Sequence, residues 1–242
     1  MRVFVLAGGL GTRLAGLHPD RPKALVPVAG RPFIEHQLEW LADHDLTDVV
    51  LCAGHGAESL TAHVGDGAPF GVRVEAVIED RPRGTAGALA GALARTAQDA
   101  TFFVVNGDTL AEFDRVAMLA LHHRLDADAT LACFRVDEAS ARGTVDPGTD
   151  GRLAGFREKA SSGPGWVSGG VYVLEARALA GVDPDSTAPV SLEQDVFPSL
   201  LAAGRTLAAW QARGRFWDMG TPEGLAEAQT FLERRQKDGP DA

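Results

Sequence analysis

V-F-V-L-A-G-G-L-G-T-R-L stands at residues 3–14, and Pro22-Lys23 follows shortly after it. The first five letters form an apolar run typical of a buried strand, and a glycine-rich loop comes directly afterwards. Glycines let the backbone approach a ligand closely and turn its N–H groups onto oxygens. Arg13 can bind two phosphate oxygens with its fork of donors, and Lys23 adds a compact positive charge. The stretch therefore indicates a strand that leads into a polyphosphate-binding loop.

Two familiar phosphate-binding motifs do not fit this loop. The dinucleotide fingerprint G-x-G-x-x-G, started at Gly9, needs a third glycine where this chain has Leu14. The Walker loop needs Gly-Lys followed by Ser or Thr, which occurs nowhere in the sequence. An ordinary strand-to-helix turn would explain Gly8-Gly9 alone. The added arginine and the Pro22-Lys23 pair favour a nucleotide site.

The first half of the chain alternates between strand and helix patterns. Strands are predicted at residues 2–6, 48–52, 72–77 and 101–105, with helices between them. After Pro32, which suits a first helical turn, Ile34, Leu38 and Leu41 recur on one helical face. Residues 85–95 are rich in alanine and favour a second helix. Such β-α-β alternation predicts a mostly parallel sheet with helices on both faces.

The second half is less regular. Residues 129–136, 145–156, 167–174 and 206–210 are predicted strands, joined by Gly, Pro and Asp turns. The segment Ser191-Leu192-Glu193-Gln194 resembles a capping box that opens a helix. A final helix is expected over 222–234, followed by a polar, frayed tail at 236–242.

Composition narrows the class of protein. The 242 residues suffice for one α/β domain with a well-buried core, and 45% are apolar. The net charge of −10 argues against a free-standing nucleic-acid binder. Cys52 and Cys133 lie in apolar runs without metal-ligand spacing, so buried free thiols are expected. No stretch has the length of a membrane span, and the early Arg13 interrupts any signal-peptide pattern. The expected location is the cytoplasm.

Three further features follow predicted strands or turns, where open parallel sheets gather their ligands. Gly84-Thr85 opens a predicted helix, and Thr85 could cap it. Asn106-Gly107-Asp108 directly follows a buried strand, where a carboxylate could hold Mg²⁺. Asp218 lies between aromatic residues and the turn Gly220-Thr221-Pro222. Taken singly, each could be an ordinary capped helix or an exposed turn.

Together these motifs resemble the sugar-1-phosphate nucleotidylyltransferases. L-A-G-G-L-G-T-R-L with P-K, the N-G-D turn and W-D-M-G-T-P-E are similar to the signature segments of that family, and the resemblance extends from about residue 2 to 229. It implies a three-layer, Rossmann-like, mostly parallel twisted sheet of the glycosyltransferase-A type, with a small sugar-binding β portion. One domain is expected over residues 1–235, with a nucleotide-binding half over about 1–125 and a sugar-binding half over 126–235.

The resemblance implies roles for individual residues. Arg13, Lys23 and Asp108 would be catalytic, and Mg²⁺ would lie on Asp108 and Asp218. The nucleotide would contact the glycine-rich loop, the start of the 85–95 helix and the N-G-D turn, namely Leu6, Ala7, Gly8, Gly9, Gly11, Thr12, Gly84, Thr85, Asn106 and Gly107. The sugar phosphate would contact Gly143, Glu158, Lys159, Ser168 and Gly170. Ser168 stands where the family commonly has a longer asparagine, and Arg142 where an aromatic residue is frequent, so the sugar contacts differ here.

The substrates implied by the resemblance are a nucleoside triphosphate and a sugar 1-phosphate. G-T-A-G-A at residues 84–88 is similar to purine-using members and favours GTP. Residues 27–41 and S-L-E-Q-D-V-F-P at 191–198 most resemble the D-glycero-α-D-manno-heptose 1-phosphate guanylyltransferases, which would form GDP-heptose and pyrophosphate. Mannose or another hexose 1-phosphate, and ATP, CTP or UTP, stay open as substrates. A homodimer is also allowed.

Two other kinds of protein stay open. The molybdenum-cofactor guanylyltransferases also begin L-A-G-G, but they lack the long second half and the W-x-D-x-G-T segment. A catalytically silent nucleotide-sugar sensor, or a regulatory subunit, is the alternative from a different class. The presence of Arg13, Lys23, Asp108 and Asp218 argues against it.

Overall fold

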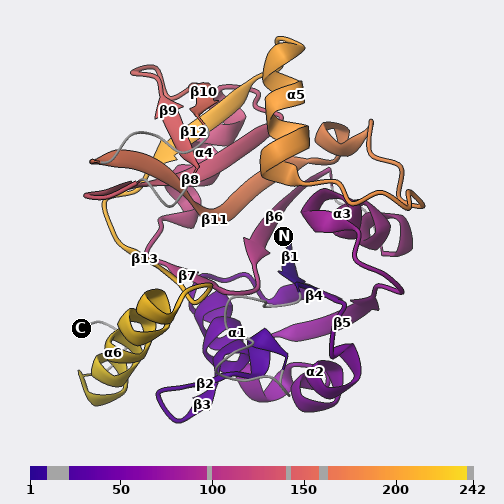
Figure 1. The fold of residues 1–242 in the computed structure, drawn as a ribbon, viewed down its shortest axis with the longest axis vertical. Coiled ribbons are helices and arrows are strands. Elements are labelled where there is room, and N and C mark those ends of the chain that lie inside the picture. The colour runs from indigo at the N-terminus through magenta and orange to yellow at the C-terminus, as the bar shows by residue number, and fades with distance from the viewer. Residues whose placement is uncertain (10–21, 97–99, 140–142, 158–162, 239–242) are drawn as a thin grey trace.

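A computed structural model describes residues 1–9, 22–96, 100–139, 143–157 and 163–238. The main strands are β1 (Arg2–Ala7), β4 (Asp48–Ala53), β5 (Arg73–Ile78), β6 (Thr101–Asn106), β8 (Ala129–Val136), β9 (Thr144–Pro147), β10 (Leu153–Arg157), β11 (Gly165–Glu175) and β12 (Leu207–Gln211). The α-helices are α1 (Phe33–Asp43), α2 (Ala57–Val64), α3 (Gly84–Arg95), α4 (Arg115–Arg124), α5 (Phe197–Ala202) and α6 (Pro222–Asp238). Figure 1 shows their arrangement.

Nine strands form one mixed sheet. Its first part is parallel, in the order β6-β1-β4-β5, with β1 between β6 and β4. The predicted strands at 2–6, 48–52, 72–77 and 101–105 therefore form this parallel part, and each is longer or shifted by one residue. The glycine-rich loop leaves the carboxyl end of β1, in the middle of the parallel strands.

Strand β11 joins this part to an antiparallel one. It pairs with β6 through residues 171–175 and with β8 along most of its length, while β12 extends the sheet parallel to β8. Near its start β11 also pairs with β9, which forms a hairpin with β10. The expected mostly parallel sheet with an additional β portion is confirmed.

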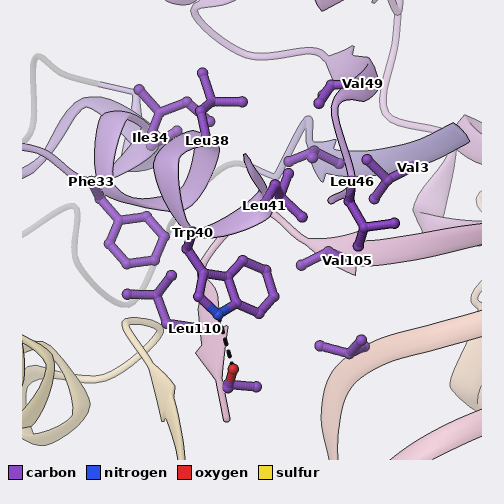
Figure 2. Close-up of a cluster of buried hydrophobic side chains, with 14 of the residues drawn as sticks. Val3, Phe33, Ile34, Leu38, Trp40, Leu41, Leu46, Val49, Val105 and Leu110 are labelled. Atoms are coloured by element: carbon purple, nitrogen blue, oxygen red, sulfur yellow. Dashed lines mark hydrogen bonds between the residues drawn. The ribbon is translucent and has the colours of Figure 1, made fainter. Parts of the chain in front are cut away.

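Helices cover both faces of the sheet because strand side chains alternate between the faces. Val3, Val5 and Leu38 belong to one buried cluster, which includes residues of α1, α2 and α6. Phe4 belongs to the other, which includes residues of α3 and α5. Figure 2 shows the α1 side, where Phe33, Ile34, Leu38, Trp40 and Leu41 gather with Val3 and Val49. The three-layer α/β architecture is confirmed.

Two short ladders lie beside the main sheet. Strand β7 (Thr109–Ala111) pairs antiparallel with β13 (Phe216–Asp218), and β2 (Pro27–Val28) pairs with β3 (Arg31–Pro32). None of these four strands was predicted, because each has only two or three residues. The β7–β13 ladder brings a late segment of the chain to the end of β6 (Figure 1).

The predicted strand at 145–156 is wrong as a single element. Strands β9 and β10 are separate and pair antiparallel. Between them, Gly148 N–H donates to the Arg152 carbonyl at 2.7 Å, and Gly151 has φ of +84°. A positive φ is costly for residues with a Cβ, so Asp150-Gly151 is a turn signal within the polar stretch D-P-G-T-D-G at residues 146–151.

Helix ends also differ from expectation. Pro32 precedes α1 as its N-cap and is not in the first turn. The capping function of Ser191 is confirmed, since its Oγ accepts from Gln194 N–H at 3.2 Å, although the first turn, η4 (Leu192–Val196), is π-helical. Helix α6 extends past its expected end at Arg234 to Asp238, and Gln236 Nε2 donates to the Ala29 carbonyl at 3.3 Å. Residues 239–242 of the predicted tail lie outside the described part.

Both cysteines are free and buried, as expected. Burial raises the pKa of the Cys133 thiol to about 12, and that of Cys52 still higher, so both stay protonated at neutral pH. Within the described part of the chain, no helix is long and apolar enough to span a membrane.

The turn after α2 gives a test of backbone strain. Gly67 has φ of +83°, and a Cβ there would lie 2.5 Å from Val74 Cγ2, whereas Gly30, with φ of +81°, has nothing within 4 Å of that position. Because Gly67→Ala adds a clash to the left-handed strain, we expect it to lower the free energy of unfolding by about 3 kcal/mol. Gly30→Ala should cost only about 1 kcal/mol. Urea unfolding measures both, and equal losses would contradict the clash.

Candidate functional site

The end of β1 is packed tightly against its neighbours. Leu6 and Ala7 close the strand, and Gly8 and Gly9 follow it. A Cβ on Gly54 would lie 2.8 Å from the Gly8 carbonyl oxygen, and one on Gly107 would lie 2.8 Å from the Leu6 carbonyl oxygen. The carboxyl ends of β1, β4 and β6 therefore meet through glycine backbones without side chains between them.

Three predicted residues of the loop, Gly11, Thr12 and Arg13, lie outside the described residues. Lys23, the second cation of the motif, lies within the described part of the chain. Lys23 opens the short 3-10 turn η1 (Lys23–Leu25), and its Nζ forms an ion pair with Asp108 Oδ2. Their side chains are 17% and 29% exposed, so the pair is largely shielded from water while keeping an open side.

Asp218 lies beside this ion pair. In the β7–β13 ladder Asp218 is opposite Thr109, and Met219 N–H donates to the Asp108 carbonyl at 2.9 Å. Gly220 N–H donates to Asp218 Oδ1 at 2.7 Å, and a Cβ on Gly220 would lie 3.2 Å from Lys23 Nζ. The structure thus gathers Lys23, Asp108 and Asp218 from three distant parts of the sequence.

These groups suit a magnesium ion. Mg²⁺ prefers hard oxygen ligands, keeps several waters and usually takes one or two protein carboxylates together with substrate phosphates. Asp108 and Asp218 provide two carboxylates on adjacent strand ends. Among the described residues no group of three or more His, Cys, Asp or Glu side chains could hold a metal. A two-carboxylate site completed by phosphate oxygens fits this donor set.

The predicted sugar-side residues of β11 lie next to the Asn106 turn. Gly170 has φ of +71°, and a Cβ there would lie 2.8 Å from Asn106 Nδ2. Ser168 Oγ accepts from Gly170 N–H and donates to the Tyr172 hydroxyl, both at 3.3 Å. Ser168, Gly170 and Asn106 therefore share one polar cluster that borders Asp108.

Of the three remaining residues predicted to contact the sugar phosphate, only Gly143 lies within the described part of the chain. Gly143 precedes β9, whose Thr144 pairs with Val167 of β11, so the antiparallel register brings Gly143 level with Ser168. Glu158 and Lys159 lie outside the described residues, directly after β10.

Glu193 and Tyr172 belong to the cluster but were not predicted as site residues. The Tyr172 hydroxyl donates to Glu193 Oε1. Desolvation by the surrounding protein raises the pKa of the Glu193 carboxyl, although the residue as a whole is exposed. The hydrogen bond from Tyr172 lowers that pKa and so opposes the rise. The negative charges of Asp108 and Asp218 raise it further, which places Glu193 within their electrostatic reach. The position of Glu193 in the first turn after the Ser191 cap was the sequence feature that could have indicated it.

The start of α3 forms a second group near β1. Gly84 has φ of +72°, and a Cβ there would lie 2.4 Å from the Val190 carbonyl oxygen. The prediction that Thr85 caps the helix is wrong. Helix α3 already begins at Gly84, and Thr85 Oγ1 accepts a hydrogen bond from Leu192 N–H at 2.8 Å. Thr85 instead ties α3 to the segment that contains Glu193.

Glu79, at the carboxyl end of β5, is the other residue that sequence reasoning missed. Its Oε2 accepts from Arg83 N–H at 3.3 Å, and its Oε1 would lie 2.8 Å from a Cβ on Gly8. Partial burial raises the pKa of this carboxyl, while the Arg83 backbone hydrogen bond opposes the rise. The side chain therefore reaches from β5 to the loop after β1 and places a half-buried carboxylate there.

Comparisons with known proteins agree with this architecture. The profile of the nucleotidyl transferase family matches residues 2–235. Mannose-1-phosphate guanylyltransferase of Mycobacterium tuberculosis is 35% identical over 95% of this chain, which spans 64% of that relative. Mannose-1-phosphate guanyltransferase of Schizosaccharomyces pombe is 31% identical over the whole chain, which spans 67% of it. This chain therefore spans about two thirds of the length of these curated relatives.

Solved structures match over nearly the full length. HddC from Yersinia pseudotuberculosis in complex with GMP-PN has a TM-score of 0.82 and 29% identity, covering 96% of this chain and 99% of that one. A putative glucose-1-phosphate thymidylyltransferase from Bacillus anthracis, at 22% identity, has the same TM-score of 0.82 and shares the fold. With the family profile matching residues 2–235, the chain belongs to the nucleotidyl transferase family.

Proposed function

We propose that this protein joins a nucleoside triphosphate to a sugar 1-phosphate and releases pyrophosphate, with GTP and D-glycero-α-D-manno-heptose 1-phosphate as substrates. The main support is the cluster of Lys23, Asp108 and Asp218 at the carboxyl edge of the parallel strands. A cation paired with one of two neighbouring aspartates, next to a glycine-rich strand end, suits a reaction between two phosphate groups.

The proposed reaction is an in-line displacement at the α-phosphorus. A phosphate oxygen of the sugar 1-phosphate forms the new bond to that phosphorus, and the bond from the α-phosphorus to the bridging oxygen of the β-phosphate breaks. The leaving group is pyrophosphate, and no covalent enzyme intermediate is needed. Because both reactants are anions, catalysis depends on charge neutralisation and positioning. Lys23 would neutralise charge near the α-phosphorus, and Arg13 would hold the leaving pyrophosphate.

Asp108 and Asp218 would hold Mg²⁺, which when bound would neutralise charge on the phosphate oxygens. Lys23 forms an ion pair with Asp108, so this carboxylate has a cationic partner within the protein. Phosphate oxygens compete with Asp108 for Lys23, which can turn on its flexible stem towards a substrate.

The preference for GTP is supported by Glu79. The Watson–Crick edge of guanine presents two adjacent donors, N1–H and N2–H, and an ionised carboxylate can accept from both. Adenine offers one donor and one acceptor there, so a carboxylate would repel its ring nitrogen. HddC was solved with GMP-PN, a guanine nucleotide. A half-buried carboxylate beside Gly8 is therefore well placed to select guanine.

The second proposed substrate is the sugar 1-phosphate. The curated relatives are mannose-1-phosphate guanylyltransferases, so mannose 1-phosphate is the nearest alternative to the heptose. Sugar contacts would come from Gly143, Ser168 and Gly170, with Glu158 on the ring hydroxyls and Lys159 on the sugar phosphate. The shorter Ser168 leaves more room than asparagine, which supports a larger sugar.

Pyrophosphate release across a matrix of nucleoside triphosphates and sugar 1-phosphates tests this function. With Mg²⁺ present, we expect release with GTP and manno-heptose 1-phosphate and less with mannose 1-phosphate. Release with mannose 1-phosphate alone would move the substrate but keep the reaction. A folded protein that binds GTP and releases no pyrophosphate with any sugar would contradict the proposed activity.

The charged cluster gives a second test. We expect Asp108→Asn and Lys23→Ala each to lower kcat by about 10²- to 10³-fold, because each removes a charge at the reacting phosphates. Glu227→Gln, an exposed residue of α6, is the matched charge-neutralising control and should behave as wild type. Circular dichroism checks that all variants fold. Near-wild-type turnover in Asp108→Asn would remove that residue from the mechanism.

Base selection gives a third test. Glu79→Gln replaces two acceptors by one donor and one acceptor, which complements the N3–H and carbonyl of uracil or thymine. We expect kcat/KM for GTP to fall by about 10²-fold and the ratio of UTP to GTP turnover to rise. Glu75→Gln, on the same strand, is the control. An unchanged order of nucleotides in Glu79→Gln would show that Glu79 only supports the turn at Arg83.

A further inference from the structure

Gln37 is a fully buried polar side chain on α1. Its amide nitrogen donates to the Asn106 carbonyl at 2.9 Å and to the Thr109 carbonyl at 2.8 Å. A side-chain amide has two N–H donors, so both are used on this one turn. The two carbonyls flank Gly107-Asp108, and Gln37 therefore spans the turn that presents the Asp108 carboxylate.

The same turn is held from two other sides. Gly107 N–H donates to the Leu6 carbonyl of β1 at 3.0 Å, and the Asp108 carbonyl accepts from Met219 N–H of the β13 segment at 2.9 Å. The backbone around Asp108 is thus fixed by α1, β1 and the end of β13 together. Gln37 provides the contact from the helix side.

The two N–H donors of the Gln37 amide explain why a glutamine, and not an apolar residue, occupies this buried position. Its Oε1 is buried without a hydrogen-bond partner among the described residues, and such an unpaired acceptor is unfavourable. An apolar side chain of the same size would avoid this, as Phe33, Leu38 and Leu41 do on the same helix (Figure 2). The two donated hydrogen bonds outweigh the unpaired oxygen.

We propose that Gln37 is a positioning residue for the proposed transferase reaction: it fixes the Gly107-Asp108 turn so that the Asp108 carboxylate lies beside Asp218 and Lys23. It touches no substrate and acts through Asp108. This inference rests on the proposed function, because it assigns to Asp108 a place in the metal and phosphate site.

The test replaces Gln37 by methionine, which has nearly the same length and volume but no donor. Trp40→Phe is the matched control. Trp40 lies one turn further along α1, is buried, and donates from Nε1 to the Ala111 carbonyl of β7 at 2.9 Å (Figure 2). Gln37→Met removes two hydrogen bonds from α1 to the β6–β7 region and Trp40→Phe removes one, but only those of Gln37 reach the carbonyls on either side of Gly107-Asp108.

Two measurements separate positioning from general stability. The first is Mn²⁺ binding by electron paramagnetic resonance, with a non-hydrolysable GTP analogue present. The second is turnover, with kcat and KM for GTP measured at saturating metal. Substitution of a residue that orients a metal ligand typically lowers metal affinity or activity by about 10- to 100-fold. We expect Gln37→Met to weaken Mn²⁺ binding and to lower kcat within that range. Trp40→Phe should change either value by less than about threefold even if it lowers Tm equally.

The inference is overturned if Gln37→Met binds Mn²⁺ and turns over like wild type, or if both variants lose activity in proportion to their loss of Tm. If Gln37→Met does not fold, Gln37→Asn replaces it, because the shorter amide keeps its donors but cannot reach both carbonyls. An intermediate loss of Mn²⁺ affinity is then expected, and an unchanged affinity overturns the inference. A silent wild-type protein would instead refute the proposed function, so the two failures are distinguishable.

Discussion

The pairing of β13 with β7 is the constraint on which the rest of the site depends. Two three-residue strands place Asp218 opposite Thr109 and join Met219 to the Asp108 carbonyl. Neighbouring carboxylates repel each other, and a nearby cation offsets that repulsion. Lys23 provides a positive charge through its ion pair with Asp108. The short ladder therefore brings both aspartates to the cationic turn that follows the glycine-rich loop.

Glycines determine how closely the parts of this site can approach. Gly8, Gly54 and Gly107 leave no room for a Cβ where β1, β4 and β6 end. Gly220 likewise leaves the space between Asp218 and Lys23 open. Because these contacts are made by backbone, the strand ends approach one another closely, and the charged side chains lie at their margin. Among the described residues, Lys23 lies at this margin with Asp108 and Asp218.

Strong local patterns in the sequence made the parallel part of the fold predictable. Contacts between single residues far apart in the sequence could not be predicted in this way. Apolar runs followed by glycine predicted β1 and β6 and the turn at Asp108 to within one residue. The strands β9 and β10 were merged although residues 146–151, D-P-G-T-D-G, carry turn signals, because each strand has only four or five residues. Glu79 and Gln37 each lie among other polar residues, so nothing in the local sequence sets them apart. Their importance depends on which backbone they reach in three dimensions, and neither periodicity nor motif spacing contains that information.

Strand β11 shows how the two proposed halves of the chain, residues 1–125 and 126–235, become one site. One edge of β11 pairs with β9 at Trp166 and Val167 and with β6 from Val171 onward, while its other edge pairs with β8 before and after a shift in register. The change of partners occurs at Gly170, where positive φ and the lack of a Cβ let the strand pass against Asn106. Ser168 on one side and Tyr172 on the other then face the polar cluster that includes Glu193. A single glycine at this crossing therefore brings the proposed sugar-binding residues to the edge of the proposed nucleotide-binding turn, and a larger residue would separate them.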